Sequence, residues 1–197
     1  EGISQSGKEV TLAVAKSMAL GTSSISVLCR SCASDLMVID IGIDSFDSDI
    51  YSMGVINHKL MHGTNNFVKE KAMPPDICLR AVLSGIEIVE NLKSKGVNII
   101  GTGEMGIGNT TTSSALSSAL LNLPVANVTG RGAGLNDIKL QRKIDIIECG
   151  INKYGFRDKS FIDSINSKSI DTRVLATIDL LSSIGGLDIA ALTGIFI

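Results

Sequence analysis

The sequence has no tryptophan, and aromatic residues make up only 4% of its 197 residues. Basic residues are also not in excess, since 18 Lys and Arg stand against 20 Asp and Glu, for a formal net charge of −2. This balance excludes the concentrated basic face that is typical of nucleic-acid-binding proteins. The 44% hydrophobic content and the 20 glycines instead favour one globular α/β domain with tight turns between strands and helices.

Long apolar segments are scarce as well. No uninterrupted apolar run reaches the roughly 20 residues that a membrane-spanning helix needs. The start of the sequence shows no basic segment followed by an apolar one, so it does not resemble a signal peptide. We therefore expect a cytoplasmic protein with no membrane partner.

Metal-ligand patterns are incomplete. Cys29 and Cys32 form a C-x-x-C pair inside a predicted helix, but no second pair completes a four-ligand zinc site. His58 and His62 are four residues apart and lack a third ligand at a familiar spacing. The sequence predicts reduced, structural cysteines, no metal site and no cofactor.

Apolar periodicity and turn residues predict the order of elements. A nearly continuous apolar run at 35–44 is typical of a strand buried in a parallel sheet, and the run "VNII" at 97–100 predicts a second buried strand. Residues 45–73 are polar and irregular. Helices are expected at 8–21, 22–33, 74–96, 109–121 and 136–155, and from about 171 onward. The series strand, helix, strand, glycine loop, helix predicts a right-handed βαβ unit.

The segment "GTGEMGIGNTTTSSALSSALL" at 101–121 raises the question of which phosphate it binds. Gly101, Gly103 and Gly106 match the dinucleotide fingerprint G-x-G-x-x-G. That site also needs an acidic residue about 20 positions later, and none occurs between Glu104 and Asp137. Asn109 occupies the position where a Walker loop has lysine. Neither common nucleotide loop fits.

The same loop is still suited to a single phosphate. Gly106 and Gly108 allow the backbone to turn its amides inward, and Asn109 can cap the following helix, whose N-terminus favours an anion. Glu104 has the acceptor geometry for sugar hydroxyls. These features indicate a ligand with one ribose and one phosphate, although a purely structural turn has the same spacing.

Two cations follow the loop in sequence. Arg131 lies in a second glycine-rich turn, "VTGRGAGL", and Lys143 lies on the helix after it. Either side chain could neutralise a phosphate that the loop amides bind. The alternative for each is an ordinary solvated surface charge.

The motifs "GEMGIGNTTTSSAL", "VTGRGAGL" and "LQRK" together resemble the nicotinate-nucleotide–dimethylbenzimidazole phosphoribosyltransferases of cobalamin biosynthesis. The resemblance extends to "EGISQSGKEVT", "VIDIGID", "HGTNNF" and "SIGGLDIAALTGI", which occur in the family's order along nearly the whole chain. It implies a Rossmann-like parallel sheet flanked by helices, a small helical domain and a homodimer.

The resemblance also implies a reaction. The family transfers 5-phosphoribose from nicotinate mononucleotide to 5,6-dimethylbenzimidazole or a related base, with inversion at C1′, giving α-ribazole 5′-phosphate and nicotinate. Glu104 is then expected to contact the ribose and the transition state. Base-pocket residues would be Ser6 and Met105, while Val14 stands where some members have glutamine. The expected phosphate and ribose contacts are Gly106, Ile107, Gly108, Asn109, Arg131, Gly132 and Lys143.

By the same resemblance, residues 1–197 form a single α/β domain that lacks both ends of the family's chain, and with them most of the small helical domain. The glutamate that acts as general base near the family's C-terminus has no counterpart here. General-base assistance contributes about 10²–10⁴-fold, so we expect ligand binding with weak or absent turnover. A non-catalytic nucleotide-binding module and, less favoured, an NAD-dependent oxidoreductase are the alternatives.

Overall fold

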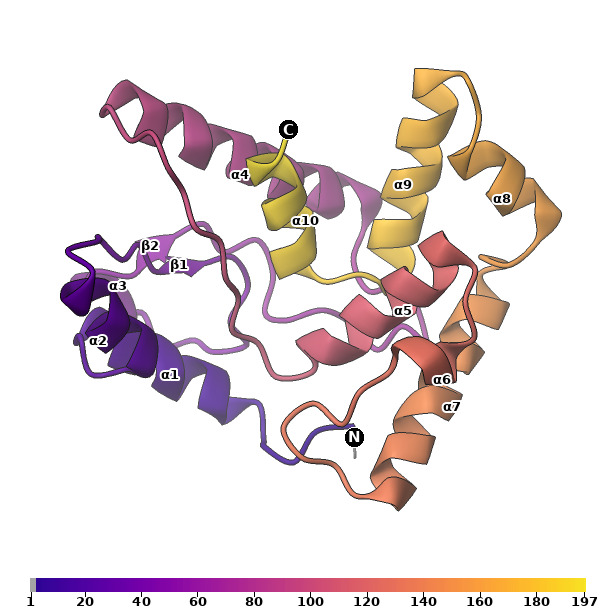
Figure 1. Ribbon diagram of the computed structural model, residues 1–197, viewed down its shortest axis with the longest axis horizontal. Helices are drawn as coiled ribbons and strands as arrows, with labels where there is room; N and C mark the ends of the chain where they lie inside the picture. Colours follow the sequence, from indigo (N-terminus) through magenta and orange to yellow (C-terminus); the bar gives the residue numbers. More distant parts are fainter. Residues whose placement is uncertain (1–2) are drawn as a thin grey trace.

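A computed structural model describes residues 3–197, in which helices surround a very small sheet (Figure 1). Among the described residues there are ten helices and two strands. Their bounds are α1 Glu9–Ala19, α2 Ser24–Ser31, β1 Ile39–Asp40, α3 Asp49–Ser52, β2 Ile56–Asn57, α4 Pro75–Ser94, α5 Asn109–Leu121, α6 Val125–Val128, α7 Asp137–Lys153, α8 Lys159–Ile165, α9 Ile170–Ile184 and α10 Leu187–Ile195.

The sheet is parallel, as expected for an α/β fold. Ile39 in β1 pairs with Ile56 in β2, and Asp40 pairs with Asn57. The apolar run 35–44 therefore forms a strand over two residues only, and short α3 supplies the crossover to β2. The α/β class is confirmed, with a much smaller sheet among the described residues than the sequence pattern predicts.

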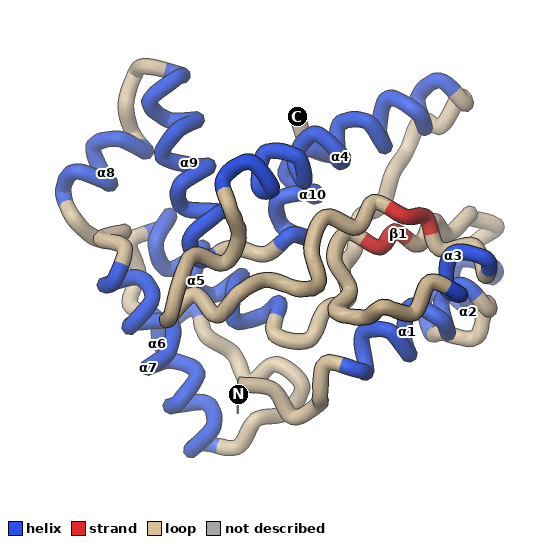
Figure 2. Tube along the Cα trace, turned by 180° about the vertical axis from the view of Figure 1, so that it is seen from behind, coloured by secondary structure: helices blue, strands red, loops and turns tan. Residues whose placement is uncertain are grey.

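The prediction of a buried strand at 97–100 is wrong. Figure 2 shows the connection from α4 to α5 as loop throughout, and Ile99 is 90% exposed. An apolar run becomes a strand only where another strand accepts and donates its backbone hydrogen bonds. Among the described residues only β1 and β2 pair with each other and no strand pairs with 97–100, so the expected βαβ unit is not formed there.

The apolar stretch 9–31 has a mean hydropathy of 1.4 in one 18-residue window, which is enough for a membrane span by composition. In the structure it is two helices of 11 and 8 residues, α1 and α2, joined by a turn at Gly21 with φ of 74°. Each helix is much shorter than the roughly 20 residues that cross a bilayer. The break argues against a membrane span.

The core forms where α5 meets α7 and α9. One face of α5 buries small residues, among them Thr111, Ala115 and Ala119, which allow neighbouring helices to approach closely. Ile147 and Ile151 of α7 fill the space opposite and are fully buried. This packing fixes the N-terminus of α5, where the glycine loop ends.

Two glycines bring α10 into direct backbone contact with α4 (Figure 1). A Cβ added at Gly194 would lie 1.9 Å from the carbonyl oxygen of Val82, and one at Gly85 would lie 2.0 Å from that of Ala191. Only hydrogen fits at either position. The close approach places the N-terminus of α10 beside the glycine loop.

We expect Gly194→Ala to lower the free energy of unfolding by about 1–3 kcal/mol, the usual cost of forcing a methyl group into a packed contact. Thermal and urea unfolding would measure the change. The control is Gly101→Ala, because no atom lies within 4 Å of the carbon added there. Equal stability of the two variants would contradict the close helix contact.

Candidate functional site

The glycine loop ends in a backbone conformation that glycine adopts readily. Gly108 has a φ of 97° and occupies the position just before α5, where a Cβ would strain the backbone. Asn109 then uses both ends of its amide: Oδ1 accepts from the Thr110 backbone N–H at 2.7 Å, and Nδ2 donates to the Glu104 carboxylate. The expectation that Asn109 caps the helix is wrong, because Gly108 occupies the N-cap position and α5 has no side-chain cap. The Asn109 side chain instead holds Glu104.

The loop amides divide into two groups. Ile107 donates its backbone N–H to Thr11 Oγ1 of α1 at 3.2 Å, and the Asn109 N–H donates to the Gly106 carbonyl at 3.2 Å. The amides of Gly106 and Gly108 have no acceptor among the described residues. Of the expected phosphate contacts in the loop, these two amides are therefore the ones available for an anion.

Lys143 is fully buried, although it carries an ammonium group. Its Nζ donates to Thr110 Oγ1 at 2.8 Å and to the Gly130 carbonyl at 3.3 Å. No carboxylate of the described residues forms an ion pair with it, and burial lowers its pKa. A buried cation with only neutral partners is unfavourable until an anion arrives. Lys143 is therefore a candidate anion-binding residue at the start of α5.

The second glycine turn lies next to the ammonium group of Lys143 and the first turn of α5. Gly132 has a φ of 54°, and a Cβ there would lie 3.1 Å from Thr110 Oγ1 and 3.7 Å from Lys143 Nζ. A side chain at this position would occupy the space next to the ammonium group. The structure thus brings Gly132 and Lys143 together with the first turn of α5, while their contact with a phosphate stays a prediction.

Arg131 is not brought to the glycine loop. Its guanidinium donates to the Leu135 carbonyl at 2.9 Å and pairs with Asp137, both within its own turn and the start of α7. These contacts brace the second glycine turn. A phosphate contact from Arg131 stays a prediction, and it requires the pair with Asp137 to open.

The N-terminal segment joins the two glycine turns. Gln5 Nε2 donates to the Gly134 carbonyl at 3.1 Å, and Thr11 accepts from Ile107 as described above. Ser6 lies between these contacts and is half-buried, as is Met105 in the glycine loop. Their roles in base binding stay predictions, as does the effect of Val14, a half-buried residue of α1.

Glu104 lies at an exposed position in the loop and has a carboxylate neighbour that sequence reasoning missed. Desolvation, and then the charge of Asp188 in α10, raise the pKa of Glu104. Desolvation also raises the pKa of Asp188. The motif "SIGGLDIAALTGI" contains Asp188, but its spacing gives no sign that the residue faces Glu104.

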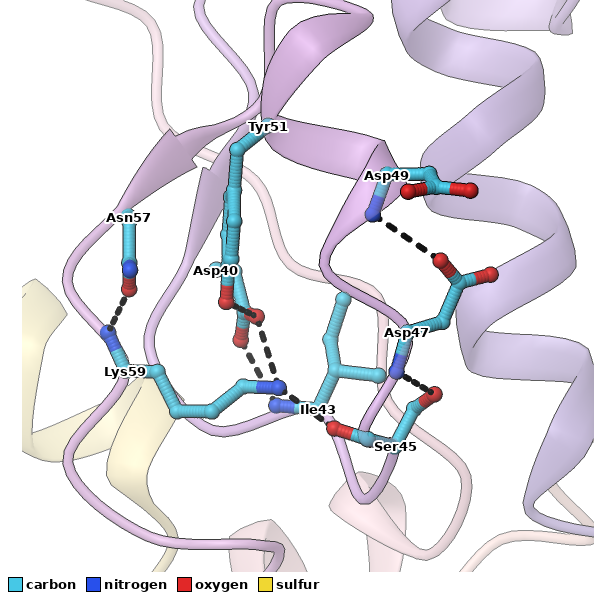
Figure 3. A network of polar contacts seen from close by, with 8 residues as sticks. All are labelled: Asp40, Ile43, Ser45, Asp47, Asp49, Tyr51, Asn57 and Lys59. Carbon is cyan, nitrogen blue, oxygen red and sulfur yellow. Dashed lines mark hydrogen bonds and ion pairs between the residues drawn. The ribbon is translucent and has the colours of Figure 1, made fainter.

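A buried polar network fixes the loop after β1 (Figure 3). Asp40, fully buried, accepts from Tyr51 Oη at 2.9 Å and from the Ile43 N–H at 2.7 Å, and it pairs with Lys59 at 3.2 Å. Burial and the hydrogen bond to Asp40 raise the pKa of Tyr51 to about 12. Beyond this network, Asp44 pairs with Lys8 at the start of α1. The N-terminal segment is therefore anchored to the carboxyl end of the sheet.

Two hollows lie away from this site, between β2 and α4. The larger, of about 410 Å³, is lined by polar residues that include His58, Lys59 and Arg80. The smaller, of about 80 Å³, lies beside Met37 and Ile88. Within residues 3–197 no group of three or more His, Cys, Asp or Glu side chains could hold a metal ion.

Comparison with known proteins decides the family. A family described as "Phosphoribosyltransferase" matches residues 1–197, that is, all of the sequence. The chain belongs to this family. It shares the family with the nicotinate-nucleotide–dimethylbenzimidazole phosphoribosyltransferase of Ruminiclostridium cellulolyticum, which is 43% identical over 197 residues covering 100% of this chain and 51% of that protein.

The enzyme of the same name from Clostridium acetobutylicum is 41% identical over 199 residues, again covering 100% of this chain and 51% of that protein. Among solved structures, CobT from Thermus thermophilus matches with a TM-score of 0.82 at 27% identity, over 99% of this chain and 53% of that one. The chain thus spans about half the length of the relatives it matches. The resemblance expected from the motifs is confirmed.

We expect Lys143→Met to raise the unfolding free energy of the ligand-free chain by about 1 kcal/mol, because methionine fills the volume without a buried charge. The pKa of Lys143 is lowered in the folded state, so below its ordinary value of 10.5 the unfolded chain binds more protons. Stability of the unsubstituted chain should therefore rise with pH from the lowered pKa toward 10.5. In Lys143→Met this rise should disappear, as pH-dependent urea unfolding would show.

The control is Arg142→Met, which removes an exposed cation from the neighbouring position of α7. This variant should keep both the stability and the pH dependence of the unsubstituted chain. If Lys143→Met were instead strongly destabilised, the ammonium group would be a structural element rather than a cation awaiting an anion.

Proposed function

We propose that this chain provides the phosphate and ribose site of an enzyme that transfers 5-phosphoribose from nicotinate mononucleotide to 5,6-dimethylbenzimidazole or a related base. The products are nicotinate and α-ribazole 5′-phosphate. Family membership supports the reaction class, and the names of the two relatives support the substrates. We further propose a cytoplasmic homodimer, as the resemblance implies.

The observation that carries this proposal is the buried ammonium of Lys143. It has two neutral acceptors, Thr110 Oγ1 and the Gly130 carbonyl, and it lies at the start of α5. The free amides of Gly106 and Gly108 belong to the same turn. A phosphate bound between these amides and Lys143 satisfies all three groups and gains from the positive end of the helix.

Glu104 precedes the free amide of Gly106 by two residues, and in this proposal its carboxylate contacts the sugar that is attached to the bound phosphate. Its carboxylate can accept a ribose hydroxyl and, because Asn109 holds it in place, can stabilise positive charge on the sugar. In the substrate the nicotinate nitrogen is cationic, so it leaves with the electron pair of the C1′–N bond. The unprotonated ring nitrogen of the acceptor base attacks C1′ from the opposite face, and the cationic base that results loses the proton of its other ring nitrogen to water.

Titration calorimetry of the chain tests the ligand directly. We expect nicotinate mononucleotide to bind more tightly than NAD, because the loop offers donors for one phosphate and no acidic residue follows it about 20 positions later, where a dinucleotide site binds the adenosine ribose. Glu104→Gln should weaken mononucleotide binding about tenfold, the scale for losing a charged hydrogen-bond partner. Glu90→Gln, at an exposed position of α4, is the control.

Tighter binding of NAD would overturn the proposal in favour of an oxidoreductase. Release of nicotinate with 5,6-dimethylbenzimidazole present, measured on this chain and on the longest native form of the protein, separates a transferase from a binding module. Mononucleotide binding without any nicotinate release in either form would favour the module.

A further inference from the structure

Asp188 lies in the first turn of α10 and faces the start of α5. A Cβ at Gly186 would come within 2.3 Å of Asp188 Oδ1 and 3.3 Å of Thr112 Oγ1, so the Asp188 carboxylate lies close to the first turns of both helices. The contact of α10 with α4 through Gly194 and Gly85 fixes this position. Asp188 is therefore held by rigid elements rather than by a loop.

One oxygen of this carboxylate lacks a donor. Asp188 Oδ2 is buried and has no hydrogen-bond partner among the described residues. Burial raises the pKa of Asp188, and the backbone N–H groups of Ile189 and Asp188 oppose this rise, as expected at a helix N-terminus. A buried acceptor that is left unsatisfied is costly, so it signals a donor that arrives with a ligand.

A ligand group that donates to Asp188 would also lie close to Glu104. Thr112 Oγ1, which lies close to Asp188, donates to the Asn109 carbonyl at 2.8 Å, and the Asn109 side chain donates to the Glu104 carboxylate. Both carboxylates therefore lie at the first turn of α5, and the charge of Asp188, after desolvation, contributes to the raised pKa of Glu104. No lysine or arginine of the described residues pairs with either carboxylate. A ribose linked to a bound phosphate presents two neighbouring hydroxyls, which are donors without charge. Each of these two hydroxyls can donate a hydrogen bond to one of the two carboxylates. A neutral ligand group with two donors therefore fits this pair of acceptors.

We propose that Asp188 is a second ribose-binding residue, which accepts one of the two ring hydroxyls while Glu104 accepts the other. The inference rests on the proposed function, because it assumes a phosphoribosyl ligand. It adds a positioning residue from a distant part of the sequence, which fixes the sugar relative to the glycine loop. Two anchored hydroxyls leave C1′ with little rotational freedom, which favours attack from one face only.

The test compares Asp188→Asn with the unsubstituted chain by titration with two probes, nicotinate mononucleotide and inorganic phosphate. We expect the mononucleotide to bind about tenfold more weakly to the variant, since one charged acceptor is lost, and phosphate to bind equally well to both. Asp171→Asn, in the first turn of α9, is the control and should change neither affinity.

The pH profile gives a second readout that a structural role would not move. Because the charge of Asp188 contributes to the raised pKa of Glu104, removing it should lower that pKa. Mononucleotide affinity, which needs the Glu104 carboxylate, falls at acid pH, and this fall should move to lower pH in Asp188→Asn. Thermal melting of each variant confirms that it is folded.

The outcomes separate the two claims. Failure of the unsubstituted chain to bind the mononucleotide would overturn the proposed function, and this inference with it. Tight binding of the mononucleotide to both forms, with the same pH profile, would overturn the inference alone. Equal weakening of phosphate and mononucleotide binding would assign Asp188 a structural role and also overturn the inference.

Discussion

A buried positive charge that has no negative partner among residues 3–197 is the central feature of the candidate site. Lys143 lies within the packing of α5 against α7, where burial disfavours its ammonium form. Burial of this kind lowers the stability of the free chain, and in the proposed function a bound phosphate would offset this cost. The glycines around it have a related role, since side chains at Gly108 or Gly132 would strain the backbone or fill the space beside the ammonium group.

The site is assembled from segments that are far apart in sequence. The N-terminal segment contacts both glycine turns through Gln5 and Thr11, and α10 brings Asp188 toward Glu104. The two glycine turns meet at Thr110 and Lys143. None of these segments forms the site alone, so the affinity for a ligand depends on the helix packing that holds them together.

Two features of the fold hold these segments in place. The backbone contact of α4 with α10 leaves no room for a side chain at Gly85 or Gly194, and it therefore sets the position of Asp188 within narrow limits. On the other side of the site, the buried network around Asp40 holds the loop that carries Asp44, which pairs with Lys8 next to the N-terminal segment. Both features lie outside the site, and both determine its geometry.

The sequence by itself determined the helices with clear boundary residues and the chemistry of the glycine loop. Pro75 and Gly96 mark α4 closely, and the missing acidic residue after the loop excluded a dinucleotide site. Local rules suffice here, because caps, turns and periodicity depend on neighbouring residues. Only the tertiary structure decided that Lys143 is buried while Arg131 pairs with Asp137, that Ile99 is exposed, and that Asp188 lies near enough to Glu104 to help raise its pKa. Burial and charge pairing depend on which distant elements pack together, and no local pattern in the sequence records that.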